Sequence, residues 1–80
     1  MINNLRELSS EEVKSYKELG TATGTFEVCL HMANKHVPDF QNRVIGYRIE
    51  NGGAAEMVNN VLENAGLDKE KSINVTFYEK

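Results

Sequence analysis

The chain has 80 residues, a net charge of −3 and an isoelectric point of about 5.3, with 40% hydrophobic and 26% charged residues. These values are ordinary for one globular domain, so residues 1–80 are expected to form a single α+β domain. Nine basic residues are outnumbered by twelve acidic ones, which disfavours nucleic acid as a partner. No apolar run reaches the ~20 residues of a membrane span, and no signal-peptide pattern opens the chain, so we expect no membrane partner and a cytoplasmic location.

The short chain predicts a thin margin of stability, because a domain of this size buries only roughly 60–65% of its unfolded surface. Small domains usually compensate with disulfides, metals or self-association. The single cysteine, Cys29, excludes an internal disulfide. We therefore expect a homodimer or another homo-oligomer, or docking on a larger protein.

The first predicted element in chain order is a helix over residues 10–19. Ser9 and Glu12 form an S-x-x-E capping box, in which each side chain satisfies a free backbone donor of the other residue. Val13 and Tyr16 then begin a narrow apolar stripe, and Gly20 is a typical C-terminal stop.

Alternation of apolar and polar residues predicts three strands, over residues 21–32, 44–50 and 72–78. Each strand would bury one face and expose the other. The first alternating set consists of Phe26, Val28, Leu30 and Met32, the second of Ile45, Tyr47 and Ile49, and the third of Ile73, Val75 and Phe77.

A second helix is predicted between the last two strands, because apolar residues recur there at helical spacing. Asn51-Gly52-Gly53 is interpreted as a strand-to-helix turn, and Gly66 ends the helix with Leu67 in a Schellman-type contact. The apolar face consists of Met57, Val58, Val61, Leu62 and Ala65.

This element order, α-β-β-α-β, predicts a three-stranded, mostly antiparallel sheet with two helices packed on one face. A strand–helix–strand crossover would make the strand over 72–78 parallel to the strand over 44–50. If the last strand lies beside the first, the order is 2-1-3 and every neighbouring pair is antiparallel, which the one-sided alternation supports. Both helices would then cover the face that carries Phe26, Ile45 and Val75.

Three patterns could carry chemistry, and each is weak. Cys29 and His31 could form a thiolate–imidazole pair, but residues i and i+2 of a strand stand about 7 Å apart. With His36 they give C-x-H-x4-H, which matches no common zinc pattern. Gly52-Gly53 before a helix resembles a phosphate cradle without its motif, and Glu56 in the first turn would repel a phosphate. We therefore expect no enzyme, no metal and no cofactor.

The loop from Lys35 to Arg43, within the irregular segment 33–43, is the strongest candidate site by position, because long loops in compact domains tend to be functional. Lys35, His36 and Arg43 flank Phe40, which we expect to be exposed. Cations beside an aromatic ring suit an anionic or planar ligand, or an anchor in a partner's pocket. The alternative is a plain loop whose Phe40 is tucked under the sheet. The polar face of the sheet is the second candidate surface, formed by Glu27, Cys29, His31, Val44, Arg48, Thr76 and Tyr78.

The function expected from these features is that of a non-enzymatic binding protein that docks on a partner macromolecule. By analogy of size and charge, it would be a small inhibitor that a phage or mobile element directs against a host defence enzyme. The alternative is a homo-oligomer that binds a nucleotide or another small anion at a subunit interface. The expected binding residues are Lys35, His36, Phe40, Arg43, Arg48 and Tyr78.

Overall fold

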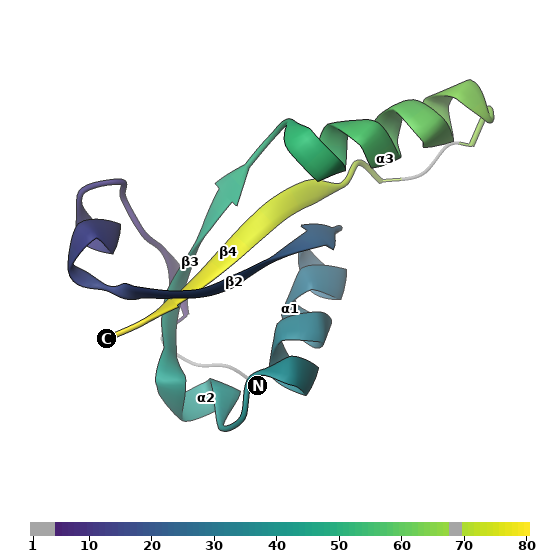
Figure 1. Cartoon of the computed structure of the whole chain (residues 1–80). Coiled ribbons are helices and arrows are strands. Elements are labelled where there is room, and N and C mark those ends of the chain that lie inside the picture. Colours follow the sequence, from purple (N-terminus) through teal and green to yellow (C-terminus); the bar gives the residue numbers. More distant parts are fainter. Residues whose placement is uncertain (1–4, 68–69) are drawn as a thin grey trace.

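The computed structural model describes residues 5–67 and 70–80, which form an α+β fold with one four-stranded mixed sheet and three α-helices (Figure 1). The sheet has the strand order β1-β3-β4-β2, so β4 lies at its centre and β2 at one edge. The strands are β1 (Arg6–Glu7), β2 (Lys17–Gly24), β3 (Val44–Glu50) and β4 (Ile73–Glu79), and the helices are α1 (Phe26–His36), α2 (Phe40–Arg43) and α3 (Gly53–Asn64). A short 3-10 helix, η1 (Glu12–Ser15), precedes β2.

The predicted capping box at the N-terminus is confirmed, although it caps a shorter element than expected. The Ser9 N–H donates to Glu12 Oε1 at 3.1 Å, and the Glu12 N–H donates to Ser9 Oγ at 3.1 Å. The predicted helix over 10–19 is wrong beyond this single turn, because residues 17–24 form β2 and pair with β4. Gly20, the expected helix stop, lies where the register of β2 shifts.

The predicted strand over 21–32 is also wrong, since most of it is helix α1. The Thr25 hydroxyl accepts a hydrogen bond from the Val28 N–H at 3.3 Å and caps the helix, a role that the alternating pattern hid. Helical spacing brings a different set of side chains into the core than strand alternation predicted. The buried side chains of α1 are Cys29 and Ala33, and those partly buried against the core include Phe26 and Leu30.

The sheet topology differs from the expected 2-1-3 order because β3 and β4 are antiparallel neighbours. The helix between them is therefore not a parallel crossover. Instead, α3 continues beyond the end of the sheet (Figure 1), and Ser72, directly before β4, lies beside it. The Asn59 side chain holds the returning chain at Ser72: its Oδ1 accepts from the Ser72 N–H at 2.7 Å and its Nδ2 donates to the Ser72 carbonyl at 2.9 Å.

The hydrophobic core lies between α1, α2 and one face of the sheet. Its buried members are Cys29, Ala33, Phe40, Val44, Val75 and Phe77. The expectation that the two predicted helices cover this face is wrong, because residues 17–24 form β2 and the apolar face of α3 is exposed. The helix that packs here is α1, which was predicted as a strand. The opposite face is partly covered by Leu8, which packs on Gly46. A Cβ at Gly46 would lie 2.5 Å from Leu8 Cγ and 2.7 Å from the Arg6 carbonyl oxygen, so this close approach requires glycine.

Candidate functional site

The predicted loop over 33–43 is largely helical, and its aromatic residue belongs to the core. Residues 37–39 alone separate α1 from α2. Phe40 is 2% exposed and meets Phe77 edge-on, with ring centroids 5.7 Å apart. The expectation of an exposed Phe40 is therefore wrong, and the alternative in which the ring is tucked under the sheet is confirmed. Phe40 stabilises the fold and is not accessible to a partner.

Arg43 is held in an ion pair at the end of β4. Its Nε and Nη2 donate to the two carboxylate oxygens of Glu79 at 3.0 and 3.3 Å, and its Nη1 donates to the Pro38 carbonyl at 3.2 Å. The hydrogen bond from Arg43 lowers the pKa of Glu79 below its ordinary value. The arrangement clamps the short α1–α2 connection to β4. Lys35 and His36, by contrast, are exposed at the C-terminal end of α1.

Arg48 and Tyr78 lie on the opposite face of the sheet from Phe40. The Arg48 Nη1 donates to the Leu8 carbonyl at 2.7 Å and so fastens the N-terminal segment to β3. Tyr78 is buried, and this burial raises the pKa of its phenol. The six predicted binding residues therefore do not converge on one surface.

The arrangement of Cys29 and His31 removes the geometric basis for a nucleophile. Both residues are in α1, where positions i and i+2 do not face one another. Cys29 is completely buried in the core, and burial raises the pKa of its thiol, whereas His31 is exposed. Within residues 5–67 and 70–80, no three His, Cys, Asp or Glu side chains are grouped in a way that could hold a metal ion.

Backbone groups at the turn before α3 already have hydrogen-bond partners within the protein, which confirms the interpretation of Asn51-Gly52-Gly53 as a turn and cap. Asn74, in β4, supplies the cap: its Oδ1 accepts from the Ala55 N–H at 3.2 Å, and its Nδ2 donates to the Gly52 carbonyl at 2.8 Å. This site lies at the Asn74 end of β4 and the Arg43 pair at the Glu79 end. Five residues of strand separate the two ends by about 17 Å, so Arg43 does not meet the donors near Gly53.

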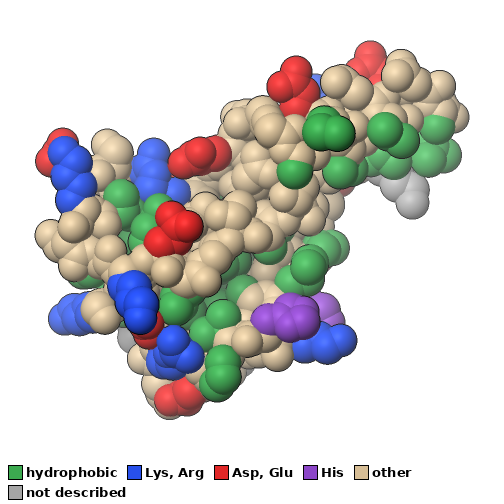
Figure 2. All heavy atoms as spheres, viewed as in Figure 1, with side chains coloured by type: hydrophobic (Ala, Val, Ile, Leu, Met, Phe, Trp, Pro, Cys, Tyr) green, Lys and Arg blue, Asp and Glu red, His purple; other side chains and the backbone are tan. Residues whose placement is uncertain are grey.

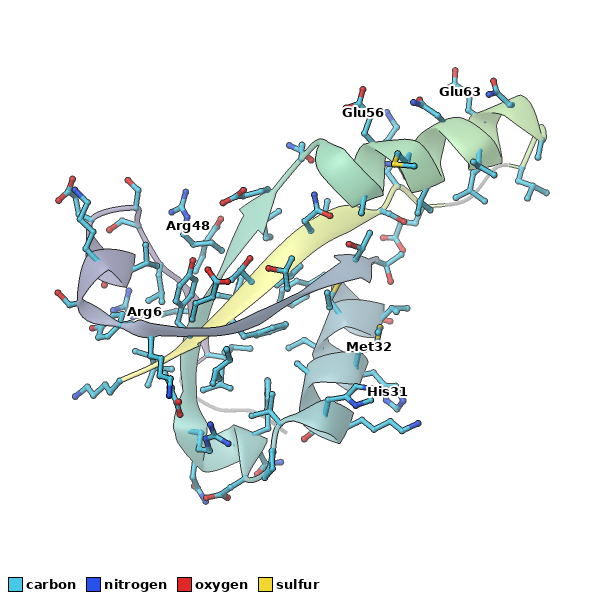
Figure 3. All side chains as sticks on the ribbon, viewed as in Figure 1. Arg6, His31, Met32, Arg48, Glu56 and Glu63 are labelled. Atoms are coloured by element: carbon cyan, nitrogen blue, oxygen red, sulfur yellow. The ribbon has the colours of Figure 1, made fainter. Side chains whose placement is uncertain are left out.

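The residues that the structure does single out are apolar side chains on α3 that the fold leaves uncovered. We call Met57, Val58, Val61 and Leu62 the α3 apolar face; these four side chains line one shallow, entirely apolar depression. Met57 is 71% exposed, Val61 67% and Val58 41%. Figure 2 shows apolar side chains gathered along α3, and Figure 3 shows Glu56 and Glu63 projecting from another side of the helix.

The polar attachments of α3 explain why its apolar residues remain exposed. Asn74 caps the first turn of the helix, and Asn59 holds the middle of the helix to Ser72. The helix ends with the predicted Schellman geometry, in which the Leu67 N–H donates to the Leu62 carbonyl at 3.0 Å. The helix is therefore held by Asn74 of β4 and by its own Asn59, while its hydrophobic stripe faces outward. The sequence identified this stripe, but its period gave no sign that it would be left uncovered.

No protein-family model matches this chain, and neither the curated proteins nor the solved structures gave a match. None of the helices in residues 5–67 and 70–80 combines the length and apolarity needed to cross a membrane.

Proposed function

We propose that this chain is a non-enzymatic binding protein that docks on a partner protein through the α3 apolar face. The observation that carries the proposal is the exposure of Met57, Val58 and Val61 on a single helix. Contiguous exposed apolar side chains of this kind mark interaction surfaces in soluble domains. The candidate loop of the sequence analysis does not share this role, because Phe40 is buried and Arg43 is paired.

The way α3 is held suits a preformed recognition helix. Its first turn is capped by Asn74 and its middle is tied to Ser72 by Asn59, so the helix is already ordered before docking. Ordering of side chains and loops is one of the main costs of association, and a rigid element avoids most of it. The helix also projects from the body: the molecule measures 41 × 26 × 17 Å, and its radius of gyration of 13.5 Å exceeds the roughly 12 Å of a compact chain of this length.

The chemistry of α3 indicates what the partner presents. Twelve residues of helix span about 18 Å, a length that fits an apolar groove on another protein. The charged side chains of α3 are Glu56 and Glu63, which would meet a basic rim beside such a groove. Inhibition of a larger enzyme, the activity expected from size and charge, is one form that this docking would take.

The proposal is tested by capturing partners from a host lysate with the wild-type protein and with Val61→Glu. Gln41→Glu adds the same charge at an exposed position outside α3 and is the matched control. A captured protein is then purified and titrated against all three forms by calorimetry. Because an unpaired carboxylate buried in an apolar interface costs several kcal/mol, Val61→Glu is expected to weaken binding by about 100-fold or more, while Gln41→Glu leaves it unchanged. Equal affinity of Val61→Glu and the wild type would remove α3 as the docking surface.

A further inference from the structure

A second surface, separate from the α3 apolar face, lies along the free edge of the sheet. In the described part of the chain, β2 pairs with β4 alone, so the backbone of its other side is unpaired. Residues 19–24 of this edge carry no charged side chain, although charges, prolines and covering elements are the usual means by which proteins protect such an edge. The edge is therefore open to pairing with another strand.

An apolar groove runs between this edge and α1. The groove encloses about 160 Å³ and is floored in part by Phe77 and Ala33. It exists because β2 turns small residues toward α1: Gly20 is the register partner of Phe77, and Ala22 is the register partner of Val75. We call this space the edge groove. Its volume is close to the roughly 150 Å³ of an apolar cavity that accommodates benzene, so it can take one bulky side chain.

The outer wall of the edge groove is a stripe on α1 formed by Val28, Met32 and His36, spaced four residues apart. Val28 is 48% exposed and Met32 39%. Val28 lies against one end of β2, where its Cγ1 is 3.1 Å from the Cβ position of Gly24, and Met32 and His36 line the groove farther along. Figure 3 shows Met32 and His31 on the outer side of α1. The stripe therefore lies beside the part of β2 from Leu19 to Gly24.

We propose that β2 and α1 form a binding site for an extended peptide segment of another protein, which adds a strand beside β2 and places one bulky aliphatic or aromatic side chain in the edge groove. Backbone hydrogen bonds along β2 would supply affinity, and the groove would select the side chain. His36 lines one end of the groove, and Lys35, the preceding residue of α1, is exposed. These two side chains favour an acidic residue in that part of the peptide.

A second copy of this chain fits the site less well than a foreign peptide. If two β2 strands paired with one another, each would offer the opposing groove only the residues that it turns toward its own α1. Three of these, Gly20, Ala22 and Gly24, are too small to fill about 160 Å³. The fourth, Leu19, packs against the core of its own copy and lines its own groove. The occupant must therefore carry a large apolar side chain that is not already packed, which a foreign peptide can supply and β2 does not.

The experiment selects binders from a library of random short peptides displayed on phage, using the immobilised full-length protein. The expected consensus alternates polar and apolar residues around one large apolar position, with an acidic residue toward one end. A synthetic peptide of that consensus should shift the amide resonances of Thr21 to Gly24 and leave those of Met57 to Leu62 in place. Failure to enrich any peptide, or shifts confined to α3, would overturn the proposal.

Three variants separate the edge groove from the docking surface proposed above. Ala22→Leu fills the groove without adding charge, and Met32→Lys places a charge on its half-exposed wall. Each variant should weaken binding of the synthetic peptide by about tenfold or more, because each removes the apolar space that receives the peptide's large side chain. Met57→Lys is the matched control on α3 and should bind the peptide as the wild type does. Undiminished binding of the peptide by both groove variants would contradict the proposal. Concentration-dependent shifts of the Thr21 to Gly24 resonances in the absence of peptide would also contradict it, because they would identify a second copy as the occupant.

Discussion

Replacement of Asn74 by alanine should release the base of α3 from the sheet. The Asn74 Oδ1 accepts hydrogen bonds from the Thr23 hydroxyl at 2.9 Å and from the Ala55 N–H at 3.2 Å, and its Nδ2 donates to the Gly52 carbonyl at 2.8 Å. A net contribution of about 1 kcal/mol for each bond, reduced where water can replace the side chain, gives a loss of about 2–3 kcal/mol in the free energy of unfolding. In a domain of this size, that loss should lower Tm by about 10–20 °C.

The assay is urea denaturation monitored by circular dichroism, with a thermal scan of the same samples. Asn51→Ala is the matched control, because Asn51 is exposed beside the same turn, and it should change stability by less than about 0.5 kcal/mol. Asn74→Asp keeps both acceptor contacts and loses the donor to Gly52, so its stability should lie between those of the wild type and Asn74→Ala. If Asn74→Ala is as stable as Asn51→Ala, the side chain does not anchor α3 and the reasoning is refuted.

Three further predictions concern the packing and charges around the sheet. Phe40→Ala should lower the free energy of unfolding by about 3–5 kcal/mol, because it empties a core position that is 2% exposed. A loss below about 1 kcal/mol in urea denaturation would place the ring outside the core. Gly46→Ala should cost about 1–3 kcal/mol and accelerate hydrogen exchange at the Leu8 amide, because the new Cβ would overlap Leu8 and the Arg6 carbonyl; unchanged exchange would contradict that contact. The hydrogen bond from Arg6 lowers the pKa of Glu12 to about 2, from an ordinary value of 4.5. The contribution of this ion pair to the free energy of unfolding should therefore be present above about pH 5 and disappear as the pH falls toward about 2. In urea titrations, the stability difference between wild type and Glu12→Gln should therefore narrow over that range, and a constant difference would argue against the ion pair.

Two strands were predicted at the right places, although burial along them does not follow the apolar alternation: β3 buries Val44 and Gly46, and β4 buries Thr76 and Tyr78 as well as Val75 and Phe77. Residues 44–50 and 73–79 form β3 and β4, close to the predicted ranges. The prediction of a strand was wrong for residues 26–32, because these residues fit both the two-residue period of a strand and the period of a helix. Phe26, Val28, Leu30 and Met32 alternate, but Cys29 and Ala33 complete a helical stripe, and the structure buries that stripe while leaving Val28 exposed. Thr25 was the local signal for the helix, as a capping residue directly before it.

The N-terminal segment shows how a correct local contact can belong to a different element. The Ser9–Glu12 capping box forms as predicted, yet it closes only the turn of η1. Residues 17–24 then become a strand because β4 offers them a full-length partner. The paired residues are 49 to 62 positions apart along the chain, from Gly24–Ile73 to Lys17–Glu79, so no local pattern could predict the pairing.

The predicted loop around Phe40 differs from the structure for a similar reason. Cations around Phe40 suggested a binding loop, but Arg43 pairs with Glu79 and the ring packs on Phe77. Those contacts depend on where β4 lies, which the predicted strand order had wrong. The α3 apolar face was visible in the sequence as a hydrophobic stripe. Its exposure follows from the tie between Asn59 and Ser72, a side chain-to-backbone contact that has no sequence signature.

The central claim, that the α3 apolar face is the docking surface, is tested most directly by methionine oxidation in the complex with the captured partner. Met57 is 71% exposed in the free protein and should be oxidised rapidly by hydrogen peroxide. Met32, on α1, serves as an internal reference in the same molecule. We predict that complex formation protects Met57, measured by mass spectrometry of its peptide, while Met32 keeps its free rate. Equal oxidation of Met57 in the free protein and in the complex would contradict the claim.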